Sequence, residues 1–203
     1  MSPRPSTAHV RRPAILTAAA EVISERGVQN TRISDVAERA GTSAPGVLYW
    51  FPTKDELLAE ALTFSDDRFY DRLTDDLATR ATATDRLTRL VELWPAEGDG
   101  ETVLWMELWV RALRDPKLAK TRERLDRRWR DAIADVIRDG QATGEFGGDD
   151  ADDLALRLGA VMDGFAIQLA LGDPAVTTEV VRRHCLDLAM RGVAHDEGKL
   201  EPA

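Results

Sequence analysis

The side chains best suited to bind another molecule follow a tight turn at residues 41–43. Tyr49, Trp50, Thr53 and Lys54 each donate a hydrogen bond or carry a positive charge. Groups of this kind bind the backbone phosphates of nucleic acids and set register without reading the base sequence. Thr53 is also a good N-cap for a following helix, whose first backbone N–H groups attract phosphate. These residue types favour contact with a polyanion.

Two short helices must position these groups, one on either side of the turn. The apolar pattern predicts the first over residues 31–40, ended by Gly41, and the second over residues 44–50, capped by Ser43. This is the geometry of a helix-turn-helix, whose second helix enters the DNA major groove. Spacing alone fits an αα-corner inside a helical bundle equally well.

Basic residues near the N-terminus favour the helix-turn-helix. Arg4, Arg11 and Arg12 lie on or beside a polar segment, residues 1–10, that we expect to form a mobile arm. Such an arm can follow the DNA backbone or enter a minor groove.

The rest of the chain reads as helical throughout, because apolar residues recur every three or four positions and period-two β-branched runs are missing. The sequence predicts an all-α fold of about nine helices: 13–26, 31–40, 44–50, 53–77, 85–94, 101–114, 118–140, 151–171 and 177–192. We expect a three-helix DNA-binding domain over residues 1–52 and a C-terminal helical bundle over residues 53–203.

Composition excludes several classes of protein. The 203 residues include no apolar run near the ~20 residues of a membrane helix. A single cysteine, Cys185, rules out an intramolecular disulfide and a cysteine zinc site, and favours the reducing cytoplasm. The three histidines are scattered and no nucleophile–base pair stands out, so we expect no metal, no cofactor and no enzymatic activity.

The net charge of −9 at first argues against nucleic-acid binding. Residues 1–54, however, carry seven basic and four acidic residues, a net charge of +3, so the remainder accounts for −12. The acidic balance therefore describes the C-terminal part of the chain.

Three motifs at this point resemble the TetR family of transcriptional regulators. They are residues 15–27 (ILTAAAEVISERG), 31–43 (TRISDVAERAGTS) and 49–58 (YWFPTKDELL), and the resemblance covers residues 11–60. It implies a helix-turn-helix domain, a helical ligand-binding and dimerisation domain, and a dimer on a near-palindromic operator. The expected DNA-contacting set is Arg4, Arg11, Arg12, Thr31, Thr42, Ser43, Ala44, Pro45, Gly46, Tyr49, Trp50, Thr53 and Lys54.

Two positions depart from the family pattern. Val47-Leu48 stands where members often have Leu-Tyr, so the phosphate contact is assigned to Tyr49 and Lys54. Trp50 replaces a histidine or tyrosine and offers one N–H donor. The side chains facing the groove are small, which favours apolar contact with thymine methyl groups.

The second half is similar to the choline-responsive BetI-type subgroup of that family. The similarity covers residues 101–192 and rests on Trp105-Met-Glu-Leu-Trp109, Trp129, residues 140–146 and residues 162–174. It implies a small-molecule effector site of unspecified ligand.

Residues 151–171 are apolar nearly all round, which indicates burial on several sides. We expect this helix and the helix over residues 177–192 to form a four-helix dimer interface; the central helix of a monomeric bundle is the alternative. The expected interface residues are Leu158, Val161, Phe165, Leu169, Val181, Cys185 and Leu188.

Large aromatic side chains are numerous in the second half and fit either a plain core or a ligand site. A cleft lined by aromatic groups with a carboxylate suits a cation. The candidate ligand-binding residues are Trp105, Trp109, Trp129, Met162, Asp163, Phe165 and Gln168, with a structural hydrogen bond as the alternative role of Asp163.

Together these patterns predict a homodimeric, ligand-responsive repressor that binds double-stranded operator DNA and a small-molecule effector, with no membrane contact. The competing hypothesis is an all-helical carrier or enzyme without DNA binding.

Overall fold

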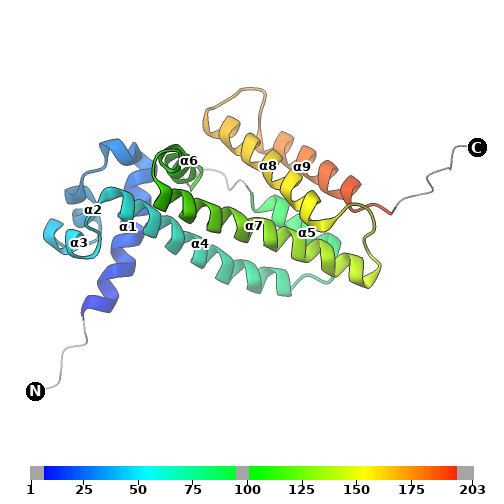
Figure 1. The fold of residues 1–203 in the computed structure, drawn as a ribbon, viewed down its shortest axis with the longest axis horizontal. Helices are drawn as coiled ribbons and strands as arrows, with labels where there is room; N and C mark the ends of the chain where they lie inside the picture. Colours follow the sequence, from blue (N-terminus) through cyan, green and yellow to red (C-terminus); the bar gives the residue numbers. More distant parts are fainter. Residues whose placement is uncertain (1–6, 95–100, 196–203) are drawn as a thin grey trace, which may run out of the picture. The chain divides into compact units, whose positions relative to one another are not determined.

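The computed structural model describes residues 7–94 and 101–195, and within these residues the chain is all-α, as predicted (Figure 1). The nine helices are α1 (Thr7–Asn30), α2 (Ile33–Arg39), α3 (Ala44–Trp50), α4 (Lys54–Ala78), α5 (Ala83–Glu92), α6 (Glu101–Ala112), α7 (Pro116–Thr143), α8 (Ala151–Ala170) and α9 (Thr178–Gly192). No strand occurs in the described ranges.

Helix α1 begins earlier than predicted, whereas its break at Gly27 falls where the prediction ended the helix. It begins at Thr7, so Pro13 lies inside the helix, and residues 7–10 of the expected arm are helical. At the other end, Gly27 has φ 72° and ψ 159°, a left-handed conformation that interrupts the helix before its last turn. The chain therefore changes direction at Gly27 on its way into α2.

Two compact units make up the chain, and their division differs from a single cut near residue 52. The first unit comprises Met1–Arg72 and Gly98–Leu125, and the second Leu73–Glu97 and Asp126–Ala203. The helix-turn-helix thus shares a unit with α6 and with the first part of α7. Helices α4 and α7 each contribute residues to both units.

One hydrophobic core fills the first unit. Helix α1 packs against α2 and α6, and α2 packs against α3. Leu104 and Leu108 of α6 are at most 2% exposed and belong to the same buried cluster as Ile15, Val36 and Val47 of the first three helices. A shared apolar core therefore joins α6 to the helices that were expected to form a domain of their own.

The second unit is built around α8, which packs against α9, while α9 also packs against α5. Leu154, Leu158 and Met162 of α8 are fully buried, as are Val181 and Cys185 of α9. At the N-terminus of α5, both oxygens of Glu145 accept backbone N–H groups, from Ala83 at 2.8 Å and Thr84 at 2.7 Å.

Candidate nucleic-acid interface

The turn between α2 and α3 has the geometry that a helix-turn-helix requires. Gly41 adopts a left-handed conformation with φ 64°, and the Thr42 N–H donates to the Ala37 carbonyl at 2.8 Å. Ser43 then caps α3, because its Oγ accepts the Gly46 N–H at 3.2 Å. Short helix, tight turn and short helix follow one another without a gap.

Helix α3 has one buried and one exposed face. Val47 is fully buried and Phe51, just past the helix, is 1% exposed, so both anchor α3 to the core. Tyr49 is 80% exposed, Leu48 is 44% exposed and Pro45 is exposed on the other face. This outward face is the surface that a major groove would meet.

Leu48 was not in the expected set, although it lies three residues after Pro45 and thus on the same helix face. Thr42, Ala44, Gly46 and Trp50 are partly exposed around this face.

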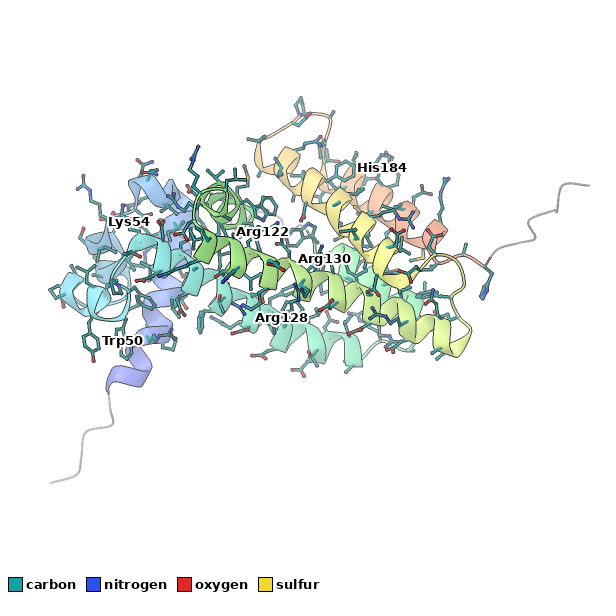
Figure 2. The ribbon with its side chains drawn as sticks, viewed as in Figure 1. Trp50, Lys54, Arg122, Arg128, Arg130 and His184 are labelled. Atoms are coloured by element: carbon teal, nitrogen blue, oxygen red, sulfur yellow. The ribbon has the colours of Figure 1, made fainter. Side chains whose placement is uncertain are left out.

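The start of α4 follows the end of α3 in the same unit, and Figure 2 labels Trp50 and Lys54 at separate places on it. Thr53 caps α4, its Oγ1 accepting the Glu56 N–H at 3.1 Å. Lys54 is partly buried, and its Nζ donates to the Val28 carbonyl at 3.4 Å, a long hydrogen bond. Its ammonium has further donors for another acceptor.

The structure corrects the expected roles of two residues. Thr31 is 1% exposed, and its Oγ1 donates to the Gly27 carbonyl at 2.8 Å, so its side chain supports the turn after α1 and cannot reach DNA. Arg12 lies within α1 and not on an arm; its guanidinium pairs with Glu60 at 2.8 Å and covers the Phe51 ring at 5.6 Å. Arg4 and the side chain of Arg11 lie outside the described residues.

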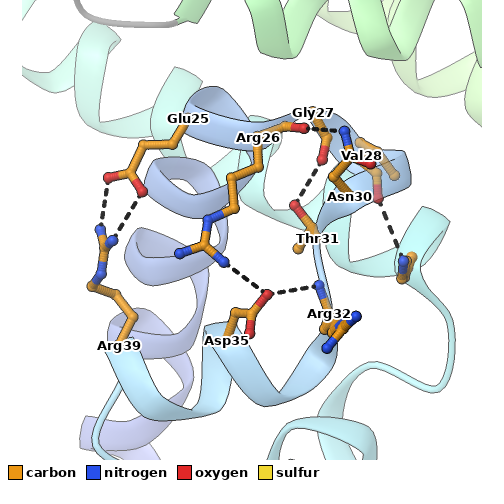
Figure 3. Close-up of polar contacts among 10 residues, drawn as sticks. Glu25, Arg26, Gly27, Val28, Asn30, Thr31, Arg32, Asp35 and Arg39 are labelled. Atoms are coloured by element: carbon orange, nitrogen blue, oxygen red, sulfur yellow. Dashed lines mark hydrogen bonds and ion pairs between the residues drawn. The ribbon is translucent and has the colours of Figure 1, made fainter.

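Ion pairs neutralise part of the positive charge of this unit (Figure 3). Arg39 donates to Glu21 and Glu25 at 3.0 Å, and its hydrogen bond to Glu25 lowers the pKa of that carboxyl. Arg26 pairs with Asp35 at 3.0 Å. Arg32 is exposed.

The candidate ligand-binding residues divide between the two units. Trp105 and Trp109 belong to the first unit, where their ring centroids are 6.3 Å apart. Trp129 belongs to the second unit, and its ring lies 5.7 Å from that of Trp94 at an interplanar angle of 31°. Met162, Asp163, Phe165 and Gln168 all lie on α8.

The expected dimer residues fall into two groups. Leu158, Val181 and Cys185 are fully buried within one chain, so their side chains have no surface left to bury against a second copy. Burial also raises the pKa of the Cys185 thiol to about 11. Val161 is 36% exposed, and Phe165, Leu169 and Leu188 are partly exposed. Phe165 stacks on His184 at 5.9 Å, which is labelled on α9 in Figure 2.

Comparison with known proteins identifies the architecture. Residues 15–61 match the model of the bacterial regulatory proteins of the tetR family, and residues 83–193 match the C-terminal domain of BetI-type transcriptional repressors. The chain belongs to the TetR family of transcriptional regulators. It is accordingly a ligand-responsive, DNA-binding regulator and not an enzyme, and its partners are operator DNA, a small-molecule effector and a second copy of itself.

Solved structures share both sequence and fold with the chain. A transcriptional regulator from Saccharomonospora viridis in complex with choline is 36% identical, with a TM-score of 0.81, over 92% of this chain and 98% of that one. A TetR-family regulator from Rhodococcus sp. is 31% identical, with a TM-score of 0.77, over 91% of this chain and 98% of that one. Among curated proteins, the regulator PksA of Bacillus subtilis is 32% identical over 49% of this chain, and the match spans about half of that relative (48%). No helix in the described part of the chain has the length and apolar character needed to span a membrane.

Proposed function

We propose that the outward face of α3 enters the major groove of the operator and that the start of α4 contacts the flanking phosphates. The observation that carries this proposal is the exposure of Tyr49, at 80%, on a helix whose opposite face is anchored by Val47 and Phe51. A large amphipathic side chain held out from a rigid helix is suited to contact a groove or a phosphate. Lys54 carries a positive charge at the start of α4, where the free backbone N–H groups of the first turn also suit a phosphate, and Asp55 and Glu56 of the same turn offset part of that charge.

Selection from a random-sequence duplex library tests this assignment. The wild-type protein should enrich a near-palindromic sequence with half-sites about one helical turn apart, because a two-fold dimer presents two copies of α3. Tyr49→Ala should weaken binding to that duplex. Val47→Ala, on the buried face of the same helix, would instead lower the stability of the fold. Equal affinity of Tyr49→Ala and wild type would contradict the proposed role of α3.

We propose further that the effector is a small organic cation of the choline class. The relative solved with choline is 36% identical to this chain and aligned over nearly its whole length. Trp129, in the same unit as Asp163, supplies the matching chemistry, since an indole ring attracts a quaternary ammonium through a cation–π contact of about 0.5–2 kcal/mol. Asp163 would supply a carboxylate to the same ligand.

A neutral isostere separates charge recognition from simple burial. Choline and 3,3-dimethyl-1-butanol have the same shape, with a carbon atom in place of the cationic nitrogen. Choline should displace the protein from its selected duplex, and the alcohol should bind at least tenfold more weakly in calorimetric titrations. Asp163→Asn should weaken the binding of choline and leave the affinity for the alcohol unchanged. Equal affinity of the two ligands would refute a cation site.

We also propose that Val161, Phe165, Leu169 and Leu188 contribute to the dimer interface, because α8 and α9 retain partly exposed apolar side chains at these positions. A charged substitution at Val161 should convert the dimer to a monomer in sedimentation experiments and abolish tight operator binding. We place the protein in the cytoplasm, where its DNA target is found.

A further inference from the structure

The turn between α1 and α2 holds a backbone N–H that its own helix cannot satisfy. Because Gly27 leaves the helical conformation at φ 72°, Val28 begins a new turn and its N–H has no helical acceptor. The Val28 side chain is 2% exposed, so water is largely excluded from this region. A buried donor without a partner costs about 1–3 kcal/mol, so such a group needs an acceptor.

Glu107 of α6 supplies that acceptor from 79 residues away in the sequence. Its Oε1 accepts the Val28 N–H at 3.0 Å. A Cβ atom on Gly27 would lie only 3.1 Å from the same oxygen, so the carboxylate fits closely against the glycine. Glu107 therefore caps a helical turn that belongs to the DNA-binding segment.

Two basic side chains contact this hydrogen-bonded pair, one at the Glu107 carboxylate and one at the Val28 carbonyl. Arg111, also on α6, lies 3.5 Å from Glu107 Oε2 and 3.3 Å from Asp55 at the start of α4. On the other side of the residue, Lys54 donates to the Val28 carbonyl at 3.4 Å. The backbone of Val28 is thus bound by charged side chains from α6 and α4.

The ion pairs between α1 and α2 are weaker than this contact. Arg39 with Glu25 and Arg26 with Asp35 are ion pairs on the exposed surface, in which the arginine side chains are 37% and 49% exposed (Figure 3). Exposed pairs of this kind contribute little to stability. The partly buried hydrogen bond to Val28 is therefore a stronger polar restraint than these surface pairs, and it acts on the same turn as the buried hydrogen bond from Thr31 to Gly27.

We infer that Glu107 is a positioning residue for operator recognition, acting through Val28 to fix the orientation of the helix-turn-helix. This inference rests on the DNA-binding function. Glu107 lies outside residues 15–61, which carry the match to the family's DNA-binding domain, and inside residues 83–193, which carry the match to the effector domain. The contact is a direct hydrogen bond between the segment matched to the DNA-binding domain and the segment matched to the effector domain.

Two substitutions at this position separate reach from charge. Glu107→Gln retains an oxygen at the same reach without the negative charge, and Glu107→Asp retains the charge but is one methylene shorter. Because the hydrogen bond to Val28 is the working contact, the glutamine variant should bind the selected duplex within about threefold of wild type. The aspartate variant should lose about tenfold or more, as expected when a hydrogen bond to a charged group is removed.

Two further readouts distinguish positioning from a loss of folded protein. Binding to random-sequence DNA, which depends on charge more than on geometry, should stay within about twofold for both variants. The Val28 amide should exchange with solvent faster in Glu107→Asp than in Glu107→Gln, measured on the DNA-free protein. Glu123→Gln on α7, an exposed carboxylate of the same unit, controls for the loss of one negative charge.

Opposite results would overturn the inference. Wild-type affinity of Glu107→Asp, or an equal loss in both variants, would show that the hydrogen bond does not position the DNA-binding helices. Unchanged exchange of the Val28 amide in Glu107→Asp would show the same without any DNA. If the wild-type protein enriches no sequence from the library while the amide exchange behaves as expected, the DNA-binding function fails and the Glu107–Val28 contact is a structural restraint only.

Discussion

Lys54 offers a direct test of the proposed phosphate contact, because its two possible roles leave different signatures. Each phosphate neutralised by a basic side chain contributes about 0.9 to the slope of log affinity against log salt concentration. A dimer carries two copies of Lys54, so Lys54→Ala should reduce the slope by about 1.8. Between 50 and 200 mM salt, this changes the ratio of wild-type to variant affinity by roughly tenfold.

The hydrogen bond from Lys54 to the Val28 carbonyl would act differently. At 3.4 Å it is long, and its loss would lower the affinity by the same factor at every salt concentration. The measurement is fluorescence anisotropy on the selected duplex and on a random duplex, at four or more salt concentrations. Lys117→Ala, which removes an exposed lysine of the same unit at the start of α7, is the matched control and should leave the slope unchanged.

Parallel lines for Lys54→Ala and wild type would refute the phosphate contact and leave Lys54 as a structural ligand of the turn after α1. A loss confined to the selected duplex would likewise contradict it, because a phosphate contact weakens binding to all sequences alike.

Four further substitutions test the local structure. Thr31→Val removes a buried hydroxyl hydrogen bond and should destabilise the protein by about 0.5–1.5 kcal/mol in urea, with operator affinity unchanged; a specific loss of affinity would restore a DNA contact for this residue. Gly140→Ala places a Cβ against the Phe146 ring and should lower the free energy of unfolding by about 1–3 kcal/mol. Gly164→Ala, with nothing within 4 Å of the new Cβ, should raise it by about 0.5–1 kcal/mol. The opposite order would show that the Phe146 side chain moves to make room for the methyl group. Hydrogen bonds from Thr84, side chain and backbone, and from the adjacent N–H lower the pKa of Glu145, so its contribution is present above pH 4.5 and lost as the pH falls through the folded-state pKa. Glu145→Gln should therefore reduce the loss of unfolding free energy between pH 4.5 and lower pH. An unchanged pH dependence would show that this carboxylate does not contribute to acid unfolding.

The sequence was most informative where local chemistry decides the structure. Helix α3 runs over Ala44–Trp50, the predicted range, because Ser43 caps it and Gly41 turns the chain in a conformation that other residues rarely adopt. The fold class was predictable for the same reason, since a repeating apolar period requires no knowledge of the partner helix. The predicted start of α1 at Pro13 was wrong. A proline is common in the first turn of a helix, but here the helix begins at Thr7 and Pro13 lies inside it.

The role of individual side chains depended on tertiary contacts and was less predictable. Thr31 looks like a surface hydroxyl in the sequence, yet the break at Gly27 turns it into the core. Cys185 and Val181 belong to an apolar stripe that suits a dimer interface equally well, but α5 and α8 of the same chain already cover it. Periodicity identifies a buried face without identifying its partner.

The boundary between the parts of the chain shows the same limit. A proline and a capping threonine near residue 52 mark the end of a short helix, and they indicate a natural domain end in the sequence. Leu104 and Leu108 nevertheless place α6 in the core of the DNA-binding helices. No local signal announces this, because residues 40 or more positions apart must first be brought together by folding.

This arrangement bears on how so acidic a chain binds DNA. The net charge of +3 over residues 1–54 already counts the carboxylates that pair with Arg26 and Arg39, and Glu60, outside that range, pairs with Arg12 and reduces the free positive charge further. Bulk attraction to phosphate is correspondingly weak, and operator affinity must depend on a few contacts made in the correct geometry. That geometry is set by the shared core and by Glu107 of α6, so a movement of α6 of less than an ångström would lengthen the bond to Val28 beyond hydrogen-bonding range. Losing that bond would, on the inference above, lower the affinity for the operator without changing the weak bulk attraction to phosphate, so specific binding would fall towards nonspecific binding.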